Sequence, residues 1–194
     1  MNRTLDWSLS EARSLAIKAA RGAGFSWGMA EEAGFAVHWL ESRSAPGIFA
    51  LASYLQDGSD DAATCPIHMG AAISDGMPVP DDGKFRVKQP LLILPFLANE
   101  QSQNQWSLAW GAQEIAFNST GIGVFDESQG ITNGVQDCHL RQSDVSFEGQ
   151  CRSRIPGKYA RYISELEKFA HHTYAPATEE SRLAGAGAGL SDND

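Results

Sequence analysis

Residues 18–40 read KAARGAGFSWGMAEEAGFAVHWL, and this stretch predicts two helices joined by a short glycine-rich turn. Gly22 and Gly24 interrupt the helical pattern, and Ser26 is a residue type that caps a new helix. Behind this cap, small and apolar residues recur at the spacing of one buried helical face, at positions 30, 33, 37 and 40. The N-terminal part of the chain is therefore predicted to be helical.

The start of the first helix and a third helix are predicted on either side of this stretch. Upstream, Ser8 and Glu11 have the spacing of a capping box, which predicts a helix that ends at Gly22. Downstream, Pro46 suits a first helical turn and precedes an apolar pattern that includes Ile48 and Leu55. Residues 57–83 are rich in Gly, Asp, Pro and Ser, which predicts a loop with at most a short helical turn.

Residues 85–151 contain short alternating segments separated by glycines, which predict a mainly antiparallel sheet. The predicted strands lie at 85–88, 91–94, 106–110, 115–117, 122–125, 135–140 and 145–147. An amphipathic helix over 157–172 and an extended tail over 173–194 follow. We predict an α+β fold in a single domain over 1–194, with N-terminal helices over 1–56, a central sheet and a C-terminal helix.

The composition is that of a globular protein, because 42% of the 194 residues are hydrophobic and 20% are charged. A formal net charge of −9 disfavours nucleic acid and anionic membrane surfaces as partners. The basic cluster over 152–161 is interpreted as a solvated face. The longest apolar run, 91–98, contains Pro95, so neither a membrane span nor a secretory signal is predicted. Three cysteines are an odd, sparse set that favours reduced thiols and a cytoplasmic protein.

The stretch 18–40 and the ending EESRLAGAGAGLSDND, residues 179–194, together resemble an uncharacterised bacterial family of about this length. The order and position of the two motifs imply that the resemblance extends over the whole chain. It implies a domain of unknown function, and it supplies no activity, cofactor or catalytic residue.

The glycine-rich turn is the most specific local feature, and two interpretations of it stay open. A turn that leads into a helix N-terminus can offer amide donors to an anion, with Arg21 and Ser26 beside it. Alternatively, the glycines supply positive φ angles in a tight turn, and Ser26 is only the cap. In the first interpretation, the ligand-binding residues are Arg21, Ser26, Trp27, Glu31 and Glu32.

Glu31 and His38 are the candidates for catalysis. They are seven residues apart, so two helical turns place them on the same strip of the helix. A carboxylate and an imidazole that face one cavity can perform acid–base chemistry near neutral pH. The alternative is the polar edge of an amphipathic helix.

Metal ligands are present in the sequence, but no metal site is predicted. Cys65 and His68 have Cys-x-x-His spacing, whereas Cys138 and His139 are adjacent in a predicted strand and point to opposite faces. Asp192 and Asp194 form an acidic ending that suits either a hard cation or solvent. The cofactor is left undetermined.

Two functions of different class follow from these features. The first is binding of a small anionic metabolite at the glycine-rich turn. The second is a non-catalytic accessory or structural subunit that forms homo-oligomers or binds a partner, in line with five tryptophans in a chain of this size. We also expect the tail over 173–194 to dock through Leu183 and Leu190 and to act as a lid.

Overall fold

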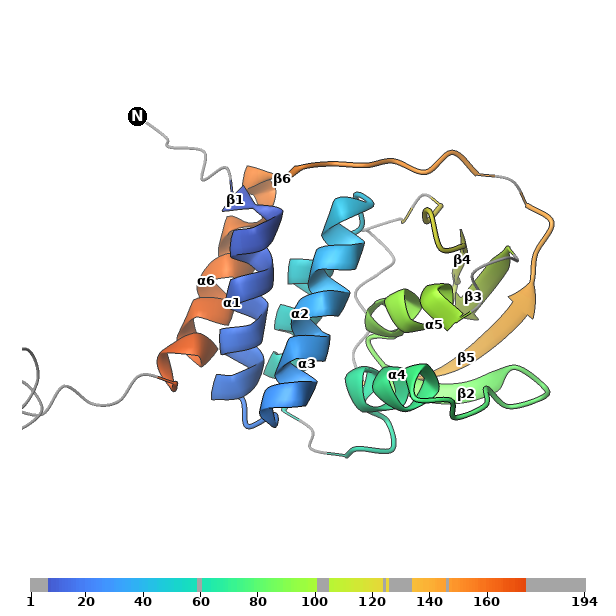
Figure 1. Ribbon diagram of the computed structural model, residues 1–194, viewed down its shortest axis with the longest axis horizontal. Coiled ribbons are helices and arrows are strands. Elements are labelled where there is room, and N and C mark those ends of the chain that lie inside the picture. The colour runs from blue at the N-terminus through green and yellow to red at the C-terminus, as the bar shows by residue number, and fades with distance from the viewer. Residues whose placement is uncertain are drawn as a thin grey trace, which may run out of the picture.

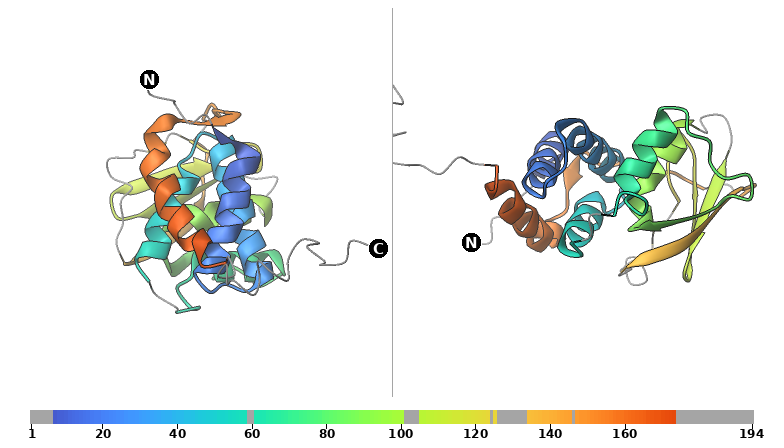
Figure 2. Two further views of the ribbon diagram at one scale, coloured as in Figure 1. Left: turned by 90° about the vertical axis from the view of Figure 1, so that its left-hand side faces the viewer. Right: turned by 90° about the horizontal axis from the view of Figure 1, so that it is seen from below.

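Four helices form a bundle at one end of the molecule (Figures 1 and 2). The computed structural model describes residues 7–58, 61–100, 105–123, 125, 134–145 and 147–173. The bundle helices are α1 (Leu9–Gly22), α2 (Trp27–Ser42), α3 (Gly47–Gln56) and α6 (Ala160–His171). Each helix packs against two others in the order α1, α2, α3, α6 and back to α1. The C-terminal helix therefore closes a bundle that the N-terminal helices begin.

The predicted helix starts are confirmed by their caps. The Ser8 hydroxyl accepts a hydrogen bond from the Glu11 amide at 3.2 Å, and the Glu11 carboxylate accepts one from the Ser8 amide at 2.8 Å. This is a complete capping box. Ser26 caps α2 by accepting a hydrogen bond from the amide of Met29. Pro46 occupies the N-cap position of α3, one residue before the first helical turn.

Helix α2 belongs to the bundle and also packs against helices outside it. Its buried residues surround the helix instead of forming one stripe: Ala30, Ala33, Gly34, Ala36, Val37, Trp39, Leu40 and Glu41. A helix that is apolar on all sides requires neighbours on all sides. These neighbours are α1 and α3 on the bundle side, and α4 (Pro66–Ser74) and α5 (Leu94–Glu100) on the other. Helix α2 therefore joins the bundle to α4 and α5.

Two predictions about the chain between the bundle and the sheet are wrong. The segment 57–83 contains α4, whose nine residues are more than a short turn. Residues 91–94, predicted as a strand, belong to a 3-10 helix, η1 (Pro90–Ile93), and to the start of α5. A short apolar run does not distinguish a buried strand from a buried helix. Pro90 and Pro95 are tolerated because both lie in first helical turns.

A four-stranded antiparallel sheet covers the far side of α4 and α5 (Figure 2). Its strands are β2 (Lys84–Lys88), β3 (Trp106–Trp110), β4 (Gln113–Phe117) and β5 (Val135–Gln142), in the spatial order β2-β5-β3-β4. Leu108 pairs with Ile115 on one side and with Leu140 on the other, so apolar residues align on the buried face. The predicted α+β fold and antiparallel sheet are confirmed.

The remaining predicted strands differ from the structure. Ile122 forms an isolated bridge with Phe117, and the described residues at 145 and 147 are not in a strand. A second, two-stranded sheet that was not predicted joins β1 (Trp7–Ser8) to β6 (Arg154–Ile155). The second 3-10 helix, η2 (Gly157–Tyr159), leads into α6 as the pattern over 157–172 predicts. The tail beyond residue 173 lies outside the described residues.

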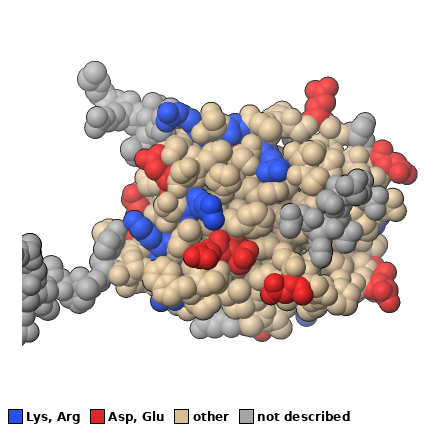
Figure 3. Space-filling view, viewed as in Figure 1, with Lys and Arg blue, Asp and Glu red and all other residues tan. Residues whose placement is uncertain are grey.

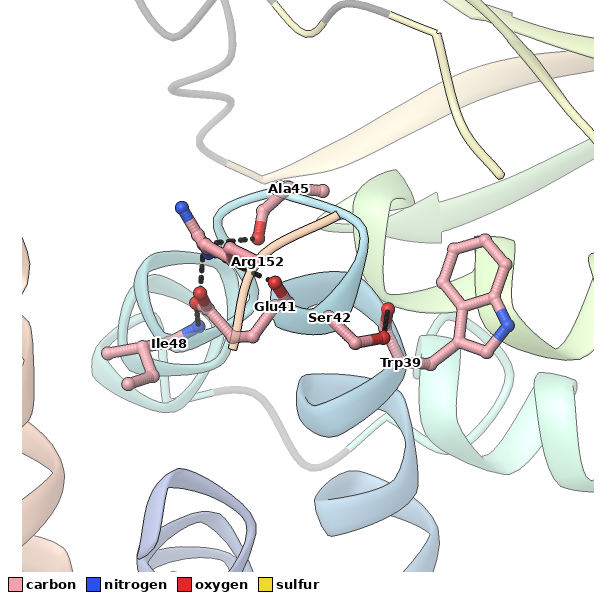
Figure 4. Close-up of polar contacts among 6 residues, drawn as sticks. All are labelled: Trp39, Glu41, Ser42, Ala45, Ile48 and Arg152. Atoms are coloured by element: carbon pink, nitrogen blue, oxygen red, sulfur yellow. Dashed lines mark hydrogen bonds and ion pairs between the residues drawn. The ribbon is translucent and has the colours of Figure 1, made fainter. Parts of the chain in front are cut away.

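The segment that returns from β5 to β6 is attached to the end of α2 through Arg152 (Figure 4). The Arg152 guanidinium forms an ion pair with Glu41, which is fully buried. It also donates hydrogen bonds to the carbonyl oxygens of Glu41, at 3.0 Å, and Ala45, at 2.9 Å. Part of the cluster that the sequence suggests is a solvated basic face is therefore internal.

Candidate functional site

The glycine-rich turn between α1 and α2 is a compact connection whose amides form hydrogen bonds to the end of α1. The amides of Ala23, Gly24 and Phe25 donate to the carbonyl oxygens of Ala19, Arg21 and Ala20 at 2.9, 3.0 and 3.1 Å. Gly24 has a φ of +103°, a conformation that L-residues rarely adopt. These three amides cap α1 and do not point freely toward a ligand.

Arg21 also acts within the turn. Its guanidinium donates a hydrogen bond to the Phe25 carbonyl oxygen and lies 4.6 Å from the centre of the Trp27 ring. A guanidinium over an indole face is a cation–π contact. Trp27 itself is 66% exposed, so its ring forms part of the surface next to Arg21.

The two predicted glutamates lie on α2 in different environments. Glu31 is exposed on α2, whereas Glu32 is half-buried and lies near Asp75 at the end of α4. Burial is the main cause that raises the pKa of Glu32, and the negative charges of Asp75 and Glu31 add to it. The set of five ligand residues stays a prediction: Arg21 and Trp27 are in contact, and Glu32 lies near Asp75.

His38 is half-buried further along α2. Burial lowers its pKa, and the positive charges of Arg13 and Arg43 lower it further. An acid–base pair of Glu31 and His38 remains a prediction.

Next to the glycine-rich turn is a cavity of about 500 Å³, here called the turn cavity. It lies between residues 22–26, the C-terminal end of α3, the N-terminal end of α4 and the C-terminal end of α6. Cavities that hold small ligands are typically about 300–1,000 Å³. Of the predicted ligand residues, Ser26 lines this cavity.

Aromatic side chains from different elements form much of the turn cavity. Phe25 stacks on His68, with ring centres 5.7 Å apart and an interplanar angle of 20°. The Tyr54 ring meets Phe25 edge-on, with centres 6.3 Å apart. On the α6 side, the Phe169 and His172 rings are in edge-to-face contact at 6.4 Å. The cavity is therefore suited to a ligand with an apolar body.

The ionisable groups that line the turn cavity are two imidazoles, a phenol and a thiol: His68, His172, Tyr54 and Cys65. No carboxylate is among its described lining residues, although the chain has 24 acidic residues. The Nδ1 atom of His172 lies 3.2 Å from the Gly22 carbonyl oxygen, which fixes the ring against the end of α1. This lining can accommodate negative charge better than positive charge.

Sequence patterns do not reveal this cavity, because Phe25, Tyr54, His68 and His172 come from four distant parts of the chain. The pair His171 and His172 is visible at the end of a predicted helix, where a cation suits the helix dipole. The folded chain places His172 against the turn cavity, while His171 lines a different groove between α1 and α6.

The other candidate ligands are not brought together. Cys65 and His68 both line the turn cavity, whereas Cys138 is buried in β5 and pairs across the strands with Phe85 and Trp110. Within the described ranges, no group of three His, Cys, Asp or Glu residues is arranged to hold a metal ion. Asp192 and Asp194 lie outside the described residues. Of the tryptophans, Trp39 and Trp110 are in the core.

Helices α1 to α4 and ten of the twelve described residues that line the turn cavity fall within the first 81 residues. Residues 7–81 match the model of a family described as Protein of unknown function (DUF3726). The DUF3726 match confirms the resemblance to an uncharacterised family for this part of the chain. The ending 179–194 lies beyond the match. No curated protein matches the chain, and no solved structure does.

A search of the described helices for membrane-spanning segments finds none that is both long and apolar enough. Charged side chains of both signs lie on the face shown in Figure 3. The basic ones gather over the helical bundle and the acidic ones extend to the sheet.

Proposed function

We propose that the turn cavity binds a small organic anion. The observation that carries this proposal is the lining of the cavity, where the imidazoles of His68 and His172 occur with no carboxylate among the described lining residues. This proposal keeps the anionic ligand expected from the sequence and moves its site from the glycine-rich turn to the adjacent turn cavity. Phe25, Ser26 and the main chain of the turn form one wall, and the imidazoles form the polar part.

The two imidazoles can bind an anion in complementary ways. His172 is oriented by the Gly22 carbonyl oxygen at its Nδ1 atom, which leaves Nε2 to donate to a ligand when the ring is protonated. His68 is held by ring stacking on Phe25, and neither of its nitrogens is needed for that contact. A carboxylate or phosphate group placed between them would accept charge-assisted hydrogen bonds.

The test is isothermal titration calorimetry of the full chain with the sodium salts of acetate, succinate, benzoate and inorganic phosphate. We expect at least one salt to bind, and the variant with His68→Gln and His172→Gln to weaken that binding at least tenfold. His171→Gln is the matched control, because His171 is the neighbouring imidazole but faces another groove. Absence of binding by all four salts, or an equal loss in the control, would overturn the proposal.

A second candidate function, that of a non-catalytic subunit, is favoured by Trp27. This side chain is 66% exposed and carries the Arg21 guanidinium on its face. Trp and Arg are the residue types most enriched where protein partners bind tightly. Light scattering coupled to size-exclusion chromatography tests this second function. We expect the wild-type protein to form a homo-oligomer and Trp27→Ser to dissociate it. A wild-type protein that is monomeric at about 100 μM would contradict the second function. Three free thiols fit action in the cytoplasm under either function.

A further inference from the structure

We propose that the turn cavity selects a planar aromatic carboxylate, a proposal that rests on the anion-binding function above. The selective element is the ring cluster of Phe25, Tyr54 and His68. These residues are supplied by the turn, by α3 and by α4, so three separate elements bring rings to one place. The imidazoles account for the charge of the ligand, and the ring cluster accounts for its shape.

The geometry of the ring cluster favours a flat ligand. Phe25 and His68 are stacked and nearly parallel, at 20°, so a flat ligand can extend this stack on an outer ring face, while Tyr54 stands at 61° to Phe25 and meets it edge-on. Aromatic rings attract one another in offset-stacked and edge-to-face arrangements beyond the effect of area alone. An aromatic ligand makes both arrangements here, whereas a saturated ring of the same size makes neither.

The inner side of the cavity is fixed by packing, which gives the cavity a defined shape there. Tyr54 is 5% exposed and Cys65 is 2% exposed, so the inner side of the cavity belongs to the packed core. Gly22 brings α1 and α6 together so closely that a Cβ atom there would lie 1.8 Å from the Phe169 carbonyl oxygen. The wall that carries Phe169 therefore cannot approach or recede without disrupting the α1–α6 contact.

The orientation of the ligand follows from the position of the polar groups. The face of the His68 ring stacks on Phe25, while its nitrogens lie at the ring edge, where an imidazole forms hydrogen bonds. A carboxylate attached directly to an aromatic ring is coplanar with it, so the ring can stack while the carboxylate lies at the edge of the stack. Aliphatic dicarboxylates and inorganic phosphate can bind the imidazoles but do not extend the ring stack.

The experiment compares benzoate with cyclohexanecarboxylate, which has the same charge and nearly the same size but is not flat. Calorimetry on the full chain should show benzoate binding about two- to tenfold more tightly, the range expected for one or two aromatic contacts. Phe25→Leu should remove the preference for benzoate over cyclohexanecarboxylate. Inorganic phosphate should bind more weakly than benzoate.

Each outcome separates this inference from the function on which it rests. Equal affinities for the two carboxylates, or a preference for phosphate, would overturn the selection of aromatic ligands and leave anion binding in place. No binding by any probe would overturn both. If Phe25→Leu does not fold, the wild-type protein decides: benzoate protons must show nuclear Overhauser contacts to the Phe25 or His68 ring, and contacts elsewhere would contradict the proposal.

Discussion

The guanidinium of Arg152 and the carboxylate of Glu41 form an ion pair between residues 111 positions apart in the chain. Burial raises the pKa of Glu41, while Arg152 and the amides of Ile48 and Gly47 act in the opposite direction. The Glu41 carboxylate also accepts a hydrogen bond from the Ile48 amide at 2.8 Å. One buried side chain thus joins the start of α3, the end of α2 and the segment that returns from the sheet.

Removing one member of this pair should be costly, because the other charge is left in a low-dielectric environment. We expect Arg152→Met to lower the free energy of unfolding by about 3–5 kcal/mol. Adding Glu41→Gln should restore part of the loss, because the substituted amide is neutral and its oxygen still accepts from the Ile48 amide. Urea denaturation of the three proteins measures this coupling. Strictly additive losses would show that the two side chains act independently.

Close packing at Gly70 gives a second prediction. A Cβ atom at this position in α4 would lie 2.2 Å from the ring of Phe96, which is fully buried in α5. We expect Gly70→Ala to destabilise the protein by about 1–3 kcal/mol through overpacking. Gly28→Ala in α2 is the matched control, because its Cβ would have no contact within 4 Å. The control should be neutral or more stable by up to about 1 kcal/mol. Equal melting temperatures for the two variants would contradict this packing.

The three thiols should differ strongly in reactivity. Cys151 is exposed, Cys65 is 2% exposed, and burial raises the pKa of Cys138 to about 12. Because the thiolate is the reactive form, Ellman's reagent at pH 8 should label one thiol rapidly in the native protein and all three in guanidinium chloride. Cys151→Ser should lack the rapid phase. A rapid phase that persists in this variant would show that a core thiol is accessible.

The raised pKa of Glu32 predicts a specific dependence of stability on pH. A carboxyl group whose pKa is higher in the folded state stabilises the fold at low pH, and this contribution is lost as the pH rises through the folded pKa. Glu32→Gln should therefore raise the free energy of unfolding at pH 7 by less than about 1 kcal/mol, since the group is partly solvated. The difference should shrink toward pH 3.5. Glu148→Gln, at an exposed position, is the control and should show no such trend.

Docking of the C-terminal tail stays a prediction, because residues 174–194 lie outside the described part of the chain. If Leu190 is an anchor, deletion of residues 184–194 should lower the melting temperature by about 2–4 °C, as a loss of about 1 kcal/mol would in a chain of this size. Differential scanning calorimetry of the truncated and full chains measures this. An unchanged melting temperature, assembly state and resistance to protease would identify the tail as a solvated extension.

Local signals in the sequence were sufficient for the parts of the fold that depend on neighbouring residues. Ser8 with Glu11, and Ser26, predict helix starts because a cap is made within four residues. Alternating Trp106, Leu108 and Trp110 predict β3 because strand periodicity is equally local. The prediction for the buried run at 91–94 was wrong, since a segment apolar on every side has no periodicity to read.

The candidate site was less predictable for the same reason. The glycine-rich turn could be found from its composition, but the structure uses Arg21 to hold the turn and places Glu32 near Asp75 of α4, a neighbour that the sequence does not indicate. The ring of His172 meets the end of α1 across 150 positions of sequence. Such a contact leaves no local pattern, and only the path of the whole chain brings it about.

The position of α6 has a consequence for the synthesis of the protein on the ribosome. About 150 residues separate the start of α1 from the start of α6, which corresponds to roughly 8–30 s of translation. During that interval the surfaces of α1 and α3 that α6 will cover are without their final partner. A nascent chain that pauses after the sheet has emerged should therefore be a better client for chaperones than the finished protein.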